Sequence, residues 1–271
     1  MKLKDKFAIT MAHGVTFLAK LLKRGGTSLP GEVALKFSPD LPQALLKDKE
    51  LILISGTNGK TSTLHFLASV YEQLGYSVVA NWSGANLIYG ITTSLLKSKA
   101  PEAGKKRVYI FEIDEAHLAK YAEILNPKHL ILTNLFEDQT DRYGSVSELR
   151  ERLRQGLNKL NNSVKIYLPS DDPQLAVIGH SRPENCYYFG REIDTDAAEF
   201  LKLCRQKDQE DIAFDSLGEQ LKASCPACGA KLHYAWRSMG QHGGFCCSNC
   251  ELSWQQPDLA YRFTEAGNCR L

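Results

Sequence analysis

Long hydrophobic runs are missing from this 271-residue sequence. No uninterrupted apolar stretch reaches the ~18–20 residues of a transmembrane helix, so we expect no transmembrane segment. A strong charge of one sign is missing too, because 33 basic and 31 acidic residues leave a formal net charge of +2. Without a basic field or an acidic tail, nucleic acid is not an expected partner.

A secretion signal is lacking as well. Asp5 stands among the early lysines, His13 and Lys20 interrupt the apolar part, and no A-x-A cleavage site follows. Without such a signal, the eight cysteines do not indicate a disulfide framework, and we expect a protein of the reducing cytosol.

The N-terminal segment instead predicts an amphipathic helix that ends at Gly25 and Gly26. Its apolar residues recur at helical spacing: Phe7, Met11, Val15, Leu18 and Leu22. We expect this stripe to face the core, and a role at a membrane surface is the alternative. Residues 24–48 carry Gly and Pro punctuation, so helix and connector together form residues 1–48.

Short β-rich runs alternate with helical patterns from residue 51 to about residue 190. The expected strands are 51–55, 77–82, 107–114, 129–135, 165–170 and 186–190. Helices are expected at 60–74, up to about 125, from the capping box of Ser145 and Glu148 to about 160, and after Pro173. Strands without polar alternation predict an α/β fold with a parallel sheet flanked by helices. This nucleotide-binding domain is expected over residues 49–200, resuming at about 253–271.

The stretch LILISGTNGKTS (51–62) lacks one glycine of the usual phosphate-binding loop. The spacing G-x-x-x-x-G-K-[ST] would place that glycine at Ile54. The loop instead comprises Gly56, Thr57, Asn58, Gly59, Lys60, Thr61 and Ser62. Its backbone N–H groups and the following helix N-terminus predict a phosphate site, where Lys60 reaches the β/γ-phosphates and Thr61 binds Mg²⁺. A glycine-rich turn that binds nothing is the alternative.

This shortened loop, G-T-N-G-K-T, resembles that of the Mur ligase superfamily, which also includes folylpolyglutamate synthases. The resemblance implies an ATP-dependent carbon–nitrogen ligase. Such enzymes convert a carboxylate into an acyl phosphate, and an amine then displaces the phosphate.

An acidic residue stands where the metal of such a loop needs a partner. Glu112 lies at the end of the expected strand 107–114, and the carboxyl ends of parallel strands face the nucleotide cleft. Glu112 matches the metal-binding glutamate of Mur ligases, which makes Lys60 and Glu112 the expected catalytic residues. Strand alternation places Asp114 on the same side. An ordinary solvated acid at a strand end is the alternative for Glu112.

The segment TNLFEDQTDRYG (133–144) resembles a Mur ligase motif in which a histidine binds metal. Gln139 replaces this histidine, and its amide oxygen is still a suitable ligand for Mg²⁺. The resemblance also implies nucleotide binding by Asn134 and by Asp171 of PSDDP (169–173). Many Mur ligases carry a modified lysine where Arg154 stands here.

Four cysteines form two C-x-x-C pairs, Cys225 with Cys228 and Cys247 with Cys250. This spacing is typical of a zinc ribbon, in which two tight turns build a tetrahedral site of four thiolates. Gly229 permits the first turn. Because no coordination position stays open, the Zn²⁺ is expected to be structural and to stabilise an insertion over residues 201–252. Coincidental cysteines, or Cys246 in place of Cys247, are the alternatives.

The loop, Gln139, the absent lysine and the inserted ribbon together resemble the MurT family, the ligase-like subunits of lipid II isoglutaminyl synthases. The resemblance covers nearly the whole chain. It implies that ATP phosphorylates the α-carboxylate of D-glutamate in the lipid II stem peptide. A partner glutaminase, GatD, would supply ammonia from glutamine, giving D-isoglutamine for peptidoglycan. The expected location is the cytoplasm, close to the membrane through lipid II.

One departure from that family is large. Its members continue into a C-terminal domain that closes over the nucleotide and contacts the glutaminase, whereas this sequence ends at Leu271. We therefore expect this chain alone to bind ATP weakly and to leave amidation incomplete. The alternative functions are another Mur-type ligase, a P-loop kinase with a zinc ribbon similar to thymidine kinases, and a zinc-ribbon binding module without catalysis.

Overall fold

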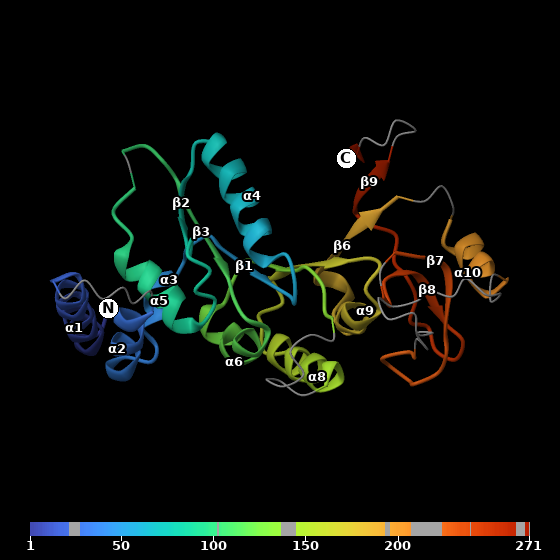
Figure 1. The fold of residues 1–271 in the computed structure, drawn as a ribbon, viewed down its shortest axis with the longest axis horizontal. Helices are drawn as coiled ribbons and strands as arrows, with labels where there is room; N and C mark the ends of the chain where they lie inside the picture. The colour runs from blue at the N-terminus through green and yellow to red at the C-terminus, as the bar shows by residue number, and fades with distance from the viewer. Residues whose placement is uncertain are drawn as a thin grey trace. The chain divides into compact units, whose positions relative to one another are not determined.

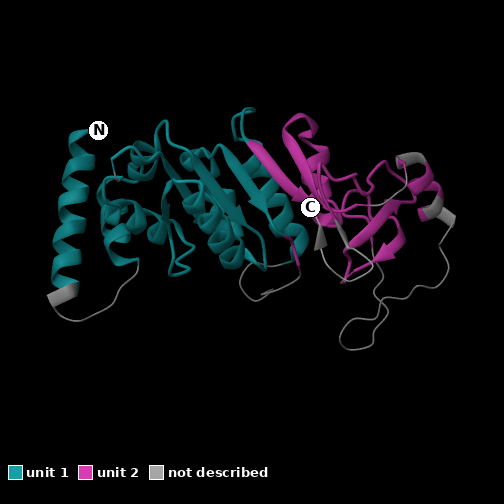
Figure 2. Cartoon of the chain, turned by 90° about the horizontal axis from the view of Figure 1, so that it is seen from above, with its two compact units in different colours: residues 1–133, 138–164 teal, residues 134–137, 165–271 magenta. Residues whose placement is uncertain are grey.

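The computed structural model describes residues 1–21, 28–101, 103–136, 145–192, 196–206, 224–238, 240–263 and 269–270. The chain divides into two compact units, which Figure 2 colours separately. The first unit comprises residues 1–133 and 138–164, and the second comprises residues 134–137 and 165–271.

The first unit holds a parallel sheet and most of the helices. Its strands are β1 (Leu51–Ser55), β2 (Ser77–Ala80), β3 (Arg107–Glu112) and β4 (His129–Leu132). Its helices are α1 (Leu3–Leu21), α2 (Leu29–Phe37), α3 (Leu41–Leu46), α4 (Lys60–Gln73), α5 (Ile88–Lys97), α6 (Glu115–Leu125) and α8 (Val146–Leu157). The four strands run parallel in the order β4-β1-β3-β2.

Helices cover both faces of this sheet, with α4 on one side and α5 and α6 on the other (Figure 1). On the α4 side, Leu64 and Ala68 pack against Ile52, Ile54 and Val108 of the sheet. All five residues of β1 are buried, as its continuous apolar sequence predicts for a strand covered on both faces. The predicted α/β fold with a helix-flanked parallel sheet is confirmed.

The segment expected to be a connector, residues 24–48, contains two helices, which its Gly and Pro punctuation did not predict. The cause is the position of proline. Pro30 and Pro42 lie in the first turns of α2 and α3, where the missing N–H has no helical partner and the fixed φ suits a helix. Gly90 lies inside α5, where a Cβ would clash with the carbonyl oxygen of Ala85.

Helix α1 turns a different face to the core from the one expected. Ala8 and Ala12 are buried, whereas Phe7 and Leu18 are 53% and 54% exposed and Met11 is 38% exposed. The two alanines pack against Ala34 and Leu41, because small side chains let α1 approach its neighbours closely. Leu22 lies outside the described residues. Within the described part of the chain, no helix combines the length and the apolarity required to cross a bilayer.

The described residues of the second unit form short strands and three helical segments. Its strands are β5 (Lys165–Pro169), β6 (Cys186–Arg191), β7 (Leu232–Arg237), β8 (Gly243–Cys247), β9 (Leu259–Phe263) and β10 (Cys269–Arg270). Its helical segments are α9 (Pro173–His180), the 3₁₀ turn Pro183–Asn185 and α10 (Ala197–Gln206). Strands β5, β6 and β9 run parallel, β10 pairs antiparallel with β9, and β7 and β8 form an antiparallel hairpin.

Candidate functional site

The glycine-rich loop lies between β1 and α4, at the carboxyl end of a central parallel strand. Gly56 and Gly59 have φ values of +126° and +83°, in the region that favours glycine. Gly59 is the N-cap of α4, so the first N–H groups of the helix point toward the loop. Thr133 Oγ1, just after β4, donates to Asn58 O at 2.7 Å and ties the loop to the neighbouring strand.

Lys60 turns its ammonium back over the loop. Nζ donates to the carbonyl oxygens of Gly56 and Thr57, the latter at 3.0 Å, and lies 3.7 Å from Glu115 Oε1. Burial raises the pKa of Glu115, and the charge of Lys60 counteracts that shift. The side chains of Lys60 and Glu115 are 14% and 8% exposed, so this positive charge is held at the loop with little access to water.

Thr61 and Glu112 meet at the end of β3. Thr61 Oγ1 donates to Glu112 Oε2 at 2.6 Å, and Glu112 is 1% exposed. The structure therefore brings together a hydroxyl and a carboxylate that are 51 residues apart, both predicted as Mg²⁺ ligands. Oxygen donors of this kind suit Mg²⁺, so the residues present fit the predicted ion. Their binding of metal stays a prediction.

Asn81, which directly follows β2, holds Glu112 in place. Asn81 is 2% exposed and hydrogen-bonds to both backbone groups of Glu112, donating from Nδ2 at 2.9 Å and accepting at Oδ1 at 3.0 Å. Gly84 has a φ of +70°, and a Cβ there would lie 3.5 Å from Glu112 Oε1. No role was predicted for Asn81, although its position directly after a parallel strand placed it at the edge of the sheet that binds ligands.

Asp114 does not lie in the strand with Glu112, so the placement on the same side that strand alternation predicted was wrong. Strand β3 ends at Glu112, and Asp114 is the N-cap of α6, where its side chain accepts from the N–H groups of Ala116 and His117. The acid that does approach the loop is Glu115, whose contact with Lys60 is described above. Sequence periodicity did not predict the approach of Glu115 to the loop, because β3 ends two residues earlier than expected.

In the second unit, the predicted residues Asn134 and Asp171 belong to neighbouring segments. Leu135 N–H donates to the carboxylate of Asp172 at 2.8 Å, which ties the Asn134 segment to the turn between β5 and α9. Asp171 lies 3.9 Å from Nδ1 of His242. Nucleotide binding by Asn134 and Asp171 stays a prediction. The predicted magnesium ligand Gln139 lies outside the described residues.

His242 lies between two carboxylates and an aromatic ring. Its Nε2 is 3.6 Å from Asp172 Oδ2, and its ring stacks on Phe136 with centroids 4.3 Å apart. Burial lowers the pKa of His242, but its interactions with the negative charges of Asp171 and Asp172 outweigh this effect and raise the pKa above its ordinary value. Burial also raises the pKa of Asp172, against the opposing effects of His242 and backbone N–H groups. Of these side chains, sequence analysis assigned a role to Asp171 alone, as a nucleotide-binding residue.

Arg154 on α8 pairs with Glu151 through two hydrogen bonds of 2.8 Å and 2.7 Å. Its charge is therefore neutralised within its own helix. The structure gives no sign that Arg154 substitutes for the modified lysine of other Mur ligases.

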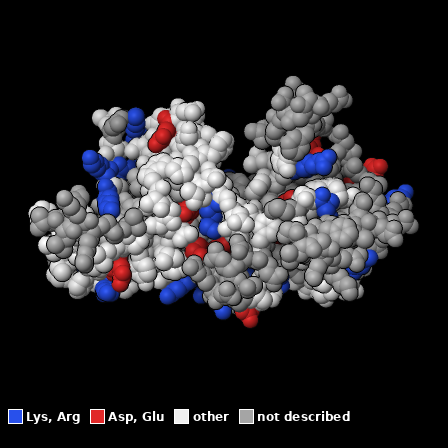
Figure 3. Space-filling model, in the orientation of Figure 1, with Lys and Arg blue, Asp and Glu red and all other residues white. Residues whose placement is uncertain are grey.

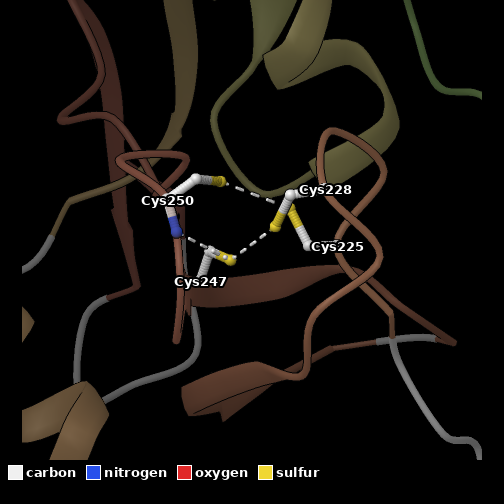
Figure 4. Close-up of side chains that lie close together, drawn as sticks. All are labelled: Cys225, Cys228, Cys247 and Cys250. Atoms are coloured by element: carbon white, nitrogen blue, oxygen red, sulfur yellow. Dashed lines mark hydrogen bonds between the residues drawn. The ribbon is translucent and has the colours of Figure 1, made fainter.

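The four predicted zinc ligands converge in the second unit (Figure 4). Cys225 and Cys228 come from the turn before β7, and Cys247 and Cys250 from the end of β8. The Sγ atoms all lie within 4.8 Å of one another, with Cys225 and Cys250 3.6 Å apart and Cys228 and Cys247 3.5 Å apart. A tetrahedron of Zn–S bonds of ~2.3 Å has S–S edges of about 3.8 Å, so these thiols fit a Zn²⁺ ion.

The surrounding backbone also suits thiolates. The N–H groups of Asn249 and Cys250 donate to Cys247 Sγ at 3.3 Å and 3.4 Å. A hydrogen bond from Ala230 N–H lowers the pKa of the exposed Cys228 thiol to about 7. Cys246 does not join the four cysteines, because successive residues of β8 point to opposite faces of the hairpin.

Charges on the surface are mixed. On the face shown in Figure 3, basic and acidic side chains of the described residues are interspersed. This distribution agrees with the nearly balanced composition and offers no extended basic field on that face.

Comparisons with known proteins bear on both units. A family model described as Mur ligase middle domain matches residues 54–234. The chain is 31% identical, over 98% of its length, to "Lipid II isoglutaminyl synthase (glutamine-hydrolyzing) subunit MurT" of Streptococcus pneumoniae, of which it covers 54%. It is 27% identical, over 95% of its length, to the subunit of the same name in Staphylococcus aureus strain COL, of which it covers 53%.

The chain thus spans about half the length of these curated relatives. Among solved structures, a crystal structure of MurF from Acinetobacter baumannii matches with a TM-score of 0.49 and 17% identity. That match covers 58% of this chain and 35% of the MurF chain.

Proposed function

The chain belongs to the Mur ligase family through its middle domain, and from this premise we propose that it is the ATP-using part of a ligase that amidates lipid II. The MurT relatives, which are named as subunits of lipid II isoglutaminyl synthase, support this substrate. The product would be the amidated stem peptide of a peptidoglycan precursor, made in the cytoplasm.

The observation that carries the proposal is the contact of Thr61 with Glu112 beside the loop. Thr61 Oγ1 and Glu112 Oε2 are 2.6 Å apart at the carboxyl ends of the sheet, where ligands of parallel α/β folds bind. With ATP, Mg²⁺ would supply charge that neutralises the phosphates, held by Thr61 and Glu112 and, as a further proposal, by Gln139. The loop N–H groups from Gly56 to Thr61 would bind the phosphate oxygens.

Lys60 would exchange its present acceptors for phosphate. Its ammonium lies on the carbonyl oxygens of Gly56 and Thr57, which phosphate oxygens would replace. There its charge stabilises the negative charge of the phosphoryl group during transfer. Glu115 keeps the ammonium at the loop from the other side. Asn134 and Asp171 remain proposed nucleotide-binding residues of the second unit.

The proposed reaction has two steps. A carboxylate oxygen of the D-glutamate residue attacks the γ-phosphorus of ATP, and ADP leaves. Ammonia, released from glutamine by a glutaminase partner that resembles GatD, then attacks the acyl carbon, and phosphate leaves. The chain's own contribution is to position the reactants and neutralise charge.

Zinc has a structural part in this proposal. Cys225, Cys228, Cys247 and Cys250 would fill all four positions of a tetrahedral Zn²⁺ site, which leaves none for a catalytic water. The ion would hold the β7–β8 hairpin to the turn that precedes it.

The test is an amidation assay. The chain, co-produced with the glutaminase of the same cell, is given lipid II in detergent, ATP, Mg²⁺ and glutamine, and mass spectrometry follows the conversion of the carboxylate to the carboxamide. We expect Lys60→Ala to lower the rate on the order of 10²–10³-fold, as loss of a transition-state donor does. Lys120→Ala, an exposed position on α6, should leave the rate unchanged. Amidation that survives Lys60→Ala, or ATP use with folate or nucleoside acceptors instead, would refute the proposal.

A further inference from the structure

The outer face of α1 carries large apolar side chains into solvent. Leu3 is 84% exposed, Phe17 68%, Leu18 54% and Phe7 53%. Of the fourteen large hydrophobic residues exposed in the described part of the chain, eight lie within residues 1–37. A concentration of this kind marks an interaction surface more often than chance.

The packing of α1 is the reverse of an ordinary amphipathic helix. Its buried positions hold alanine, with Ala8 0% and Ala12 1% exposed, while its phenylalanines point outward. Figure 2 shows α1 at the outer edge of the first unit. Burying alanines in place of phenylalanine and leucine forgoes hydrophobic stabilisation of the fold. The exposure of these phenylalanines is explained if an apolar partner outside this chain covers the outer face of α1.

The charges around this face are positive. Lys2, Lys4 and Lys6 are exposed at the start of α1. The helix has a single acid, Asp5, which is 2% exposed and accepts hydrogen bonds from Ser38 Oγ and Lys2 N–H, both at 2.7 Å. The negative charge is therefore turned inward, and the exposed part of α1 presents cations beside apolar side chains.

A hollow of about 620 Å³ extends this positive region from the start of α1. Five of its lining residues are lysines and three are aspartates. Of these aspartates, Asp5 is buried and Asp40 pairs with Lys4 at 2.9 Å. The surface next to the apolar face thus matches a negatively charged partner.

Helix α4 also exposes apolar side chains, but it does not combine them with exposed lysines. Phe66, in the middle of that helix, and Leu74, just after its last residue, are 68% and 67% exposed. After Lys60, however, α4 contains no Lys or Arg, and Glu72 is exposed on it. Of these two helices, α1 alone joins an apolar face to a cluster of exposed lysines.

We propose that the outer face of α1, formed by Leu3, Phe7, Met11, Phe17 and Leu18, binds the anionic surface of a phospholipid bilayer. A helix lying in the interface inserts Phe and Leu between the acyl chains while lysines contact negatively charged headgroups. The choice of a lipid surface over a protein rests on the proposed function, because a lipid-linked substrate brings its enzyme to the membrane. Binding through α1 holds the first unit, and with it the loop at Gly56, close to that substrate.

The test is flotation of the whole chain with vesicles that contain no lipid II. We expect it to float with equal parts of phosphatidylglycerol and phosphatidylcholine, and much less with phosphatidylcholine alone. Phe17→Glu combined with Leu18→Glu should lower partitioning about tenfold or more, because two side chains lose their apolar burial. The matched control, Phe66→Glu combined with Leu74→Glu, should float as the unchanged chain does. Circular dichroism verifies that both double variants are folded.

Three results would overturn the inference. The unchanged chain does not float with anionic vesicles; both double variants lose flotation equally; or the chain is a dimer that the α1 variant alone converts to monomer without any vesicle binding. The last result assigns the face to a second copy of the chain. Because these vesicles lack lipid II and ATP, failure here leaves the ligase proposal intact, and the detergent amidation assay tests that proposal without a bilayer.

Discussion

Glu112 is the residue on which the proposed magnesium site depends most. It is buried, its carboxylate accepts from Thr61, and Asn81 fixes its backbone on both sides. The side chain is therefore preorganised before any ligand binds, which lowers the cost of coordinating an ion.

Replacing this carboxylate with an amide should weaken binding of Mg²⁺ with nucleotide. For Glu112→Gln we expect a loss at least as large as the roughly 10–100-fold that follows removal of an outer-shell partner of a metal. Calorimetric titration with an ATP analogue, with and without Mg²⁺, measures it. The control is Glu123→Gln, an exposed acid on α6. Equal magnesium dependence in Glu112→Gln and the unchanged chain would argue against the site.

His242 gives a second prediction, on pH. Its folded-state pKa is above the ordinary value of about 6.5, so its contribution to stability is complete below that pH and is lost as the pH rises through the folded value. The raised pKa of Asp172 acts in the same direction, because the folded form again binds more protons. The stability of the second unit, measured relative to a His242→Gln variant, should therefore fall as the pH rises above about 6.5.

Thermal unfolding of both proteins across this range provides the measurement. The difference in stability between the two proteins at each pH does not contain the pH dependence of zinc binding, because both proteins share it. If the stability of the unchanged chain relative to the variant stays constant, or rises with pH, the raised pKa assigned to His242 is wrong.

At this scale, sequence reasoning was strongest where a motif is local. The loop from Gly56 to Ser62 depends on neighbours in the chain, and its place between strand and helix was predicted correctly. Asn81 and Glu115 were missed, because their roles come from partners 31 and 55 residues away. Pattern alone does not show which polar side chains a fold brings together.

Helix packing supplies a prediction at the scale of elements. Gly156 lies where α8 contacts α6, and a Cβ there would be 2.4 Å from the carbonyl oxygen of Ala119. Because backbone gives way poorly, Gly156→Ala should destabilise the first unit by about 1–3 kcal/mol. The matched variant Gly14→Ala in α1 meets nothing within 4 Å and should stabilise by about 0.5–1 kcal/mol.

Denaturant unfolding of the first unit distinguishes the two substitutions. They have the same chemistry and both lie in helices, so only the surroundings differ. If both variants shift the midpoint in one direction, close approach at Gly156 is not what limits that position.

The cysteine cluster gives the next prediction. Cys228→Ser should remove stoichiometric zinc and expose the backbone of the β7–β8 hairpin to hydrogen exchange, because the ion supplies much of the folding energy of so small an element. The control Cys186→Ser changes a buried cysteine of β6 outside the cluster and should retain zinc. Metal analysis and hydrogen exchange report both effects. Full zinc content in Cys228→Ser would refute the four-thiolate site.

Elements themselves were predictable where hydrophobic pattern and turn chemistry agreed. Strand β1 and helix α4 match their expected ranges closely. The outward face of α1 was not predictable, because periodicity identifies an apolar stripe but does not show whether the stripe or the alanines beside it pack on α2. Proline at α2 and α3 was taken as punctuation, although it also begins helices.

For the molecule as a whole, family and fold followed from the sequence more directly than chemistry did. A shortened loop, an acid at the end of β3 and two C-x-x-C pairs sufficed to predict a Mur ligase domain, and the family match over residues 54–234 confirms it. The acceptor and the ammonia source are not encoded in residues of this kind. The choice of acceptor and of ammonia source depends on binding surfaces and on a partner protein, which no sequence motif of this chain identifies.

The central claim is that the turn after β1 binds ATP with Mg²⁺ opposite Glu112. A crystal structure of the chain with Mg²⁺ and a non-hydrolysable ATP analogue tests it most directly. The account predicts phosphates on the N–H groups of residues 56–61, with the metal about 2.0–2.1 Å from Thr61 Oγ1. A nucleotide bound at another place on the chain, or a turn that stays without phosphate at saturating analogue, would contradict it.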